Sequence, residues 1–105
     1  MVQAINNALD YTRDVPIQRI ESDKILFHAV TYNIQIIGEA AYKLTYEFRE
    51  SHPEVEWEDI IGMRHVLVHG YYTVEPSLVW NVVRKQLDPL KQQLLAYLED
   101  MPNDK

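Results

Sequence analysis

Residues 24–48 read KILFHAVTYNIQIIGEAAYKLTYEF, and their pattern sets the architecture expected for the whole chain. Apolar side chains recur here three and four positions apart, the spacing of one face of an α-helix. That face comprises Leu26, Val30, Ile34, Ile37, Ala41, Leu44 and Phe48. Phe27, Tyr32 and Ile36 lie on the other faces. We therefore predict a long central helix that is buried on more than one side.

The segment that precedes this helix predicts a shorter one. Val2–Asp14 keeps a helical apolar pattern, and the pair Val15-Pro16 breaks it, because the residue before a proline disfavours helical backbone angles. Ser22 or Asp23 can then cap the N-terminus of the central helix.

A third helix is predicted after a break at residues 51–54, which read SHPE. It covers about Val55–His69, and Gly70 can close it in a left-handed conformation. Glu75-Pro76 opens a fourth helix, since proline is well tolerated in a first helical turn. Pro89 is expected to kink or split that helix near Asp88.

Together these patterns predict an all-α fold, an antiparallel bundle of about four to five helices. The 105 residues suffice for one compact core, so we expect a single domain in which residues 99–105 form a loose tail. A chain of this size can bury an uncovered apolar helix face by pairing with a second copy, which makes a homodimer or a higher oligomer the expected assembly.

Composition restricts the chemistry and the compartment. The sequence contains no cysteine, which excludes disulfides, thiolate metal sites and cysteine nucleophiles. Neither a basic and apolar leader nor a membrane-spanning apolar run is present, so we expect a soluble cytoplasmic protein with no membrane contact. The net charge of −6 argues against nucleic-acid binding through a broad basic face, and leaves a local cationic cleft or a basic partner as the alternatives.

The densest group of reactive side chains lies in RHVLVHGYY, residues 64–72. At about 100° per residue, His65 and His69 share one helix face. Arg64 and His69 diverge by about 140° in a regular helix, so they can meet only across a bend or from different chains.

These residue types suit RNA cleavage without a metal ion. That reaction needs a base for the 2′-hydroxyl proton, a cation at the phosphate and an acid for the leaving 5′-oxygen. Arg64 supplies a permanent charge for the phosphate, His69 titrates near neutrality as acid or base, and Tyr71 can orient the scissile phosphate. The second proton-transfer group is His65 of the same chain or His69 of a symmetry mate. We favour the mate, because a two-fold interface of the third and fourth helices would place two motifs in one cleft.

The motif Arg64-x-x-x-x-His69-x-Tyr71 resembles the signature of HEPN domains in the HepT-like branch. The runs IIGEAA at residues 36–41, PEVEW at 53–57, IIGMR at 60–64 and VW at 79–80 are similar to that branch in order and spacing. The resemblance covers about Ala29 to Leu95.

The resemblance implies a dimeric helical bundle and a metal-independent endoribonuclease toxin with Arg64 and His69 catalytic, without a cofactor. It also implies a minimal nucleotidyltransferase as antitoxin, which in family members can adenylylate the tyrosine that matches Tyr71. Glu39 matches a polar family position that faces the site. His65 stands where the family commonly has asparagine, so we assign it an auxiliary role.

Other interpretations of the same residues stay open. Glu39 needs a cationic partner inside the central helix, and its expected pairing with Arg64 serves either the stability of the bundle or the positioning of Arg64. His65 and His69 have metal-ligand spacing, but without a third ligand we expect no metal site. The alternative functions are a non-catalytic helical module that binds a nucleotidyltransferase, or a purely structural dimer.

Overall fold

The computed structural model describes residues 1–70 and 74–100, and over these residues the chain is an assembly of helices. The elements are α1 (Val2–Tyr11), α2 (Ile17–Ser22), α3 (Lys24–Tyr42), α4 (Tyr46–Ser51), α5 (Trp57–His69), α6 (Pro76–Asn81), the π-helical segment η2 (Val82–Gln86) and α7 (Leu87–Asp100). The predicted all-α class is confirmed. Within the described residues, no helix combines the length and the apolar character that a membrane span requires.

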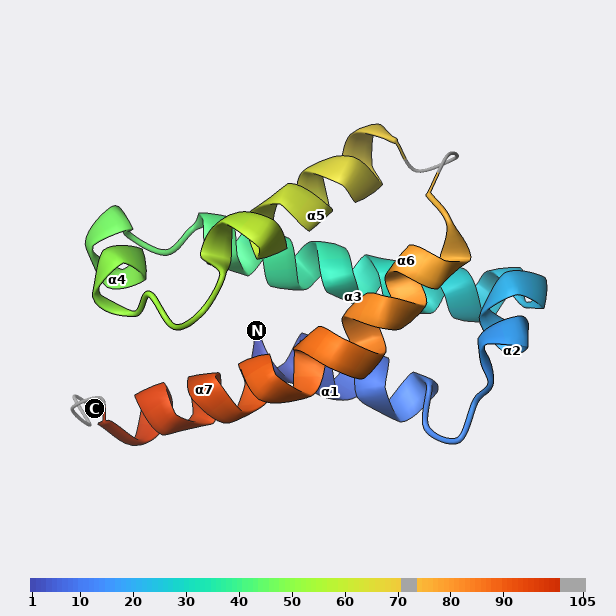
Figure 1. Ribbon diagram of the computed structural model, residues 1–105, viewed down its shortest axis with the longest axis horizontal. Helices are drawn as coiled ribbons and strands as arrows, with labels where there is room; N and C mark the ends of the chain where they lie inside the picture. Colours follow the sequence, from blue (N-terminus) through green and yellow to red (C-terminus); the bar gives the residue numbers. More distant parts are fainter. Residues whose placement is uncertain (71–73, 101–105) are drawn as a thin grey trace.

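The central helix is α3, as its apolar spacing predicts. The Asp23 side chain accepts a hydrogen bond of 3.1 Å from the Leu26 amide and caps the helix N-terminus. In Figure 1, α5 lies on one side of α3, while α1 and α7 lie on the other. α3 packs against α1, α2, α5 and α6, whereas α7 packs against α1.

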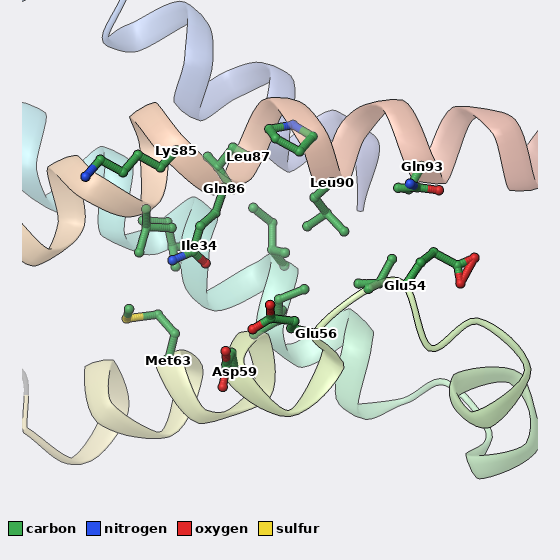
Figure 2. A pocket seen from close by; sticks show the side chains of 15 residues that line it. Ile34, Glu54, Glu56, Asp59, Met63, Lys85, Gln86, Leu87, Leu90 and Gln93 are labelled. Atoms are coloured by element: carbon green, nitrogen blue, oxygen red, sulfur yellow. The ribbon is translucent and has the colours of Figure 1, made fainter.

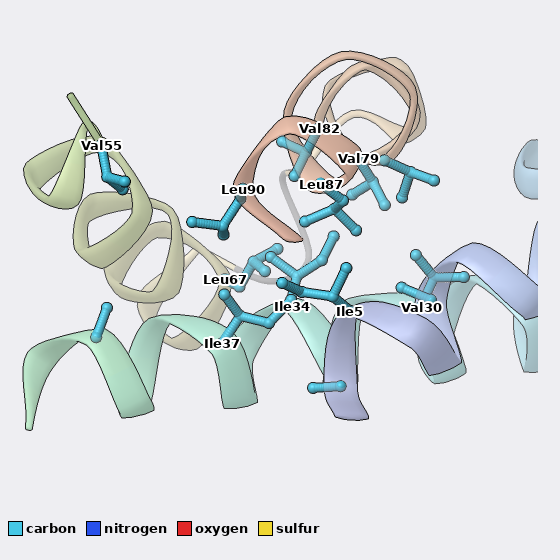
Figure 3. Close-up of a cluster of buried hydrophobic side chains, with 14 of the residues drawn as sticks. Ile5, Val30, Ile34, Ile37, Val55, Leu67, Val79, Val82, Leu87 and Leu90 are labelled. Carbon is cyan, nitrogen blue, oxygen red and sulfur yellow. The ribbon is translucent and has the colours of Figure 1, made fainter. Parts of the chain in front are cut away.

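The core lies where α1, α3, α5 and the arm formed by α6, η2 and α7 meet (Figure 3). Its largest fully buried side chains include Ile5, Ile37, Leu67, Val79 and Val83, which come from four different parts of the chain. Burial of such apolar surface is the main favourable contribution to the free energy of folding. The amphipathic patterns read from the sequence therefore converge on one shared core.

Several predicted boundaries were wrong for local reasons. α3 ends at Tyr42 rather than near Phe48, because Thr45 adopts an extended conformation and its hydroxyl accepts a hydrogen bond from the Phe48 amide. That cap starts the separate helix α4. Likewise, α1 ends at Tyr11 rather than Asp14, because Asp14 has a φ of 57°, outside the helical region. The short helix α2 was not predicted either.

Two expectations about the second half of the chain had different outcomes. Gly70 has a φ of −124°, so α5 does not end in a left-handed cap. The irregularity expected near Asp88 is present, because the π-helical segment η2 interrupts the α-helix and α7 begins at Leu87. Pro89 has no N–H to offer the carbonyl four residues earlier, and the wider π-helical turn just before it accommodates that loss.

The central helix α3 was predicted to be buried on more than one side, and the exposure of its outer side chains differs from that prediction. Phe27 is half-buried, whereas Tyr32 and Ile36 are exposed, at 63% and 36%. At the end of the chain, α7 includes Glu99 and Asp100, which the sequence had assigned to the tail. Residues 101–105 of that predicted tail lie outside the described residues.

Candidate active site

The candidate site begins at a close contact between α3 and α5. Gly38 of α3 lies directly under Arg64, and a Cβ atom placed on Gly38 would be 2.3 Å from the Arg64 Cβ and 3.0 Å from the Ile60 carbonyl oxygen. Real Cβ atoms do not approach so closely, so only glycine fits here. Gly38 therefore lets α3 and α5 pack closely.

This contact places Glu39 beside Arg64. Arg64 Nη2 lies 3.0 Å from Glu39 Oε2, and the two side chains are 33% and 45% exposed. Lys43 approaches the other oxygen of the same carboxylate less closely, at 3.9 Å. The predicted partnership of Glu39 with Arg64 is therefore present in the fold, and it holds the guanidinium at the surface of the α3–α5 pair.

His65 and His69 form the second part of the site. Both are exposed, and their ring centroids are 4.4 Å apart on one face of α5. α5 is continuous from Trp57 to His69. Arg64 and His69 are five positions apart in this unbroken helix, so they diverge by about 140° as expected.

Tyr71 lies outside the described residues, which end at Gly70 on this side of the gap. The role predicted for Tyr71 therefore stays a prediction. Among residues 1–70 and 74–100, no three histidine or carboxylate side chains gather in a way that could hold a metal ion.

The chain matches the family model described as "Ribonuclease HepT-like" over residues 1–97. The chain belongs to the HepT-like ribonuclease family. A protein named "Probable ribonuclease HepT", from Thermococcus cleftensis, is 31% identical over 87% of this chain and 83% of its own length. No solved structure matches the chain significantly.

Proteins named "Putative RNase" are similar to this HepT-like chain as well. One from Caldanaerobacter subterraneus subsp. tengcongensis is 30% identical over 94% of the chain and 88% of its own length. Another from Methanocaldococcus jannaschii is 28% identical over 90% of the chain and 86% of its own length. These matches confirm the family resemblance read from the sequence.

The acidic charge of this HepT-like chain is concentrated away from the motif. Residues 47–59 carry six acidic side chains and one arginine, a local formal charge of −5 out of −6 for the whole chain. They occupy α4, the following loop and the first turn of α5, whereas residues 64–69 occupy the other end of α5. Along residues 60–70, Arg64 is the only side chain with a formal charge. The net negative charge of the whole chain therefore does not describe the local charge around the motif.

One cluster near the acidic end was not anticipated from the sequence. The His52 ring lies 4.2 Å, centroid to centroid, from both Phe48 and Tyr97, and Trp57 Nε1 donates a hydrogen bond of 3.0 Å to the His52 carbonyl. Burial and the Glu54 carboxylate raise the pKa of Tyr97. This cluster fixes the loop before α5 against α7, and no spacing rule links residues so distant in sequence. Trp57 is a core residue, and His52 caps the C-terminus of α4.

Proposed function

We propose that this chain is the toxin of a toxin–antitoxin pair, a metal-independent endoribonuclease that uses Arg64 and His69. The observation that carries the proposal is the ion pair between Glu39 and Arg64, set at a helix contact that only Gly38 permits. It presents one fixed cation on the helix that also carries two exposed histidines, in a chain of the HepT-like ribonuclease family.

Each side chain has a distinct role in the proposed reaction. A histidine takes the proton of the 2′-hydroxyl, and the resulting 2′-oxygen attacks the adjacent phosphorus. The guanidinium of Arg64 neutralises charge that develops on the non-bridging phosphate oxygens. The bond to the 5′-oxygen breaks as a second histidine protonates that oxygen, which leaves a 2′,3′-cyclic phosphate and a 5′-hydroxyl. Glu39 positions Arg64, and His65 is auxiliary.

The second histidine comes from another copy of the chain in this proposal. The unbroken α5 directs Arg64 and His69 to different sides, so one copy does not point both at a single phosphate. Exposed apolar side chains on α5 and α6, namely Val66, Val68 and Leu78, offer surface for a two-fold contact near the motif. A homodimer built on these elements would bring two motifs to one cleft and double its local positive charge.

A minimal nucleotidyltransferase is the proposed antitoxin, and adenylylation of Tyr71 is the proposed means of neutralisation. The support is the family resemblance of the motif that Tyr71 completes. An adenylyl group on Tyr71 would add bulk and a negative phosphate to the motif, which opposes the binding of an RNA phosphate.

The decisive experiment is cleavage of mixed cellular RNA in EDTA by purified wild-type protein and by His69→Ala at the same oligomeric state. We expect wild-type products that end in 2′,3′-cyclic phosphate, no products from His69→Ala, and growth arrest on expression of wild type alone. Gln92→Ala, an exposed polar position on α7, is the matched control and should cleave like wild type.

Absence of cleavage by wild-type protein whose Tyr71 mass spectrometry shows to be unmodified would contradict the proposal. Binding of a nucleotidyltransferase by both wild type and His69→Ala, without any RNA product, would then favour a non-catalytic interaction module.

A further inference from the structure

A cavity of about 320 Å³ lies between α5 and the η2–α7 arm, with α3 as its floor (Figure 2). Its apolar wall comes from three separate elements: Ile34, Ile37, Ile60, Met63, Leu87 and Leu90. The cavity exists because α5 packs mainly on α3 and diverges from α7. Its volume falls at the lower end of the range of small-molecule sites.

Part of the cavity lining is charged. Glu54, Glu56, Asp59 and Lys85 line it, and Figure 2 shows the carboxylates of Glu56 and Asp59 close to one another, with Glu54 and Lys85 apart from this pair. Neither Glu56 nor Asp59 takes part in an ion pair among the described parts of the chain. The hydrogen bond and the charge of Asp59 raise the pKa of Glu56, as expected for two carboxylates in contact.

An apolar wall beside two carboxylates that have no ion-pair partner is complementary to a ligand that joins a cationic group to an apolar body. The apolar body of such a ligand would cover the half-buried side chains of Ile60 and Met63, which are still partly open to water. A cationic group would neutralise the repulsion between the carboxylates through charge-assisted hydrogen bonds. An anionic ligand of the same shape would add a third negative charge and be rejected.

We propose that this cavity is a binding site for a small organic cation, an ammonium group carried on an alkyl or aryl body. The ammonium group lies between Glu56 and Asp59, and the apolar body lies against Met63 and Leu90. This site is separate from the candidate active site, because Arg64 faces Glu39 of α3 while its neighbour Met63 faces the cavity. A bound cation contacts both α5 and α7, and thereby holds in place the helix that carries the motif.

The test uses the full chain and 4-phenylbutylamine as the probe, followed by methyl NMR. We expect saturable shifts of the methyl signals of Ile34, Met63 and Leu90. 4-Phenylbutan-1-ol and 4-phenylbutanoate have the same body without the positive charge, and we expect both to bind at least tenfold more weakly than the amine.

Two kinds of substitution test the carboxylates and the cavity separately. Glu56→Gln and Asp59→Asn each remove one charge at exposed positions, and we expect each to weaken amine binding about tenfold. Gln86→Trp fills the cavity from an exposed position and should abolish binding. Gln92→Trp is its matched control on the same arm, lies outside the cavity lining, and should bind like wild type.

Equal binding of the amine and the alcohol would overturn the proposal, because the carboxylates would then have no role in recognition. Absence of methyl shifts up to the solubility limit of the amine would also overturn it, as would unchanged binding in Gln86→Trp. None of these readouts depends on RNA cleavage, so this inference and the proposed nuclease fail independently.

Discussion

Arg64 Nη2 lies 3.0 Å from Glu39 Oε2, and the Cα of Gly38, one position earlier, lies where any side chain would collide with the Cβ of Arg64. The ion pair and the close contact thus depend on the same helix crossing. This relationship gives Glu39 and Gly38 separable roles, one electrostatic and one steric, which substitutions can distinguish.

Gly38→Ala should destabilise the fold. The added methyl group would sit 2.3 Å from the Arg64 Cβ, so α3 and α5 must separate, at a cost of about 1–3 kcal/mol in unfolding free energy. Urea denaturation measures this. Gly62→Ala is the matched control, because nothing lies within 4 Å of its Cβ and Gly62 is inside α5. It should stabilise the fold by about 0.5–1 kcal/mol, and destabilisation of similar size in both variants would refute the steric argument.

Glu39→Gln should separate stability from activity. The pair is partly exposed, so its loss should lower the unfolding free energy by less than about 1 kcal/mol. Loss of the fixed guanidinium should slow RNA cleavage roughly 10- to 100-fold, mainly in kcat. Lys43→Ala removes the more distant partner of the same carboxylate and should leave cleavage unchanged. If Glu39→Gln keeps the wild-type kcat, the ion pair stabilises the helical bundle and does not position Arg64 for cleavage.

Mixed dimers of wild type and His69→Ala test the shared cleft. If one cleft uses His69 of both chains, a mixed dimer lacks one of the two proton-transfer groups and is inactive. Equal mixing after refolding should therefore leave about a quarter of the wild-type cleavage rate, because only the wild-type homodimers cut RNA. Half of the wild-type rate, although mass spectrometry detects the mixed dimers, would place the complete site within one chain.

Glu56→Gln should stabilise the protein at neutral pH. The Asp59 hydrogen bond and charge raise the folded-state pKa of Glu56 above its usual value of 4.5, so the repulsion appears as pH rises through that raised pKa. The variant should unfold at a higher urea concentration than wild type at pH 7, and this difference should vanish below pH 4.5. Glu58→Gln, in the first turn of α5 that follows the N-cap residue Glu56, is the control and should be slightly destabilising, because it loses a favourable interaction with the helix N-terminus.

Local sequence patterns were sufficient for the elements whose stability is local. The apolar period of residues 24–42 and the proline in the first turn of α6 act within a few residues and were predicted correctly, and the observed cap Asp23 is one of the two that the sequence left open. The break between α3 and α4 was missed, because the apolar period continues through Leu44 and Phe48 while the Thr45 cap ends the helix. A periodic pattern cannot report which of two competing backbone conformations is lower in free energy.

The sequence by itself determined the helical class, the family and the residue types of the motif, because periodicity and spacing are properties of neighbouring positions. Only the tertiary structure decided that Gly38 brings α5 close enough for Glu39 to pair with Arg64. The same is true of the cavity between α5 and α7, which depends on how far two helices diverge. Distances between elements are set by packing over the entire core, and no stretch of sequence contains them alone.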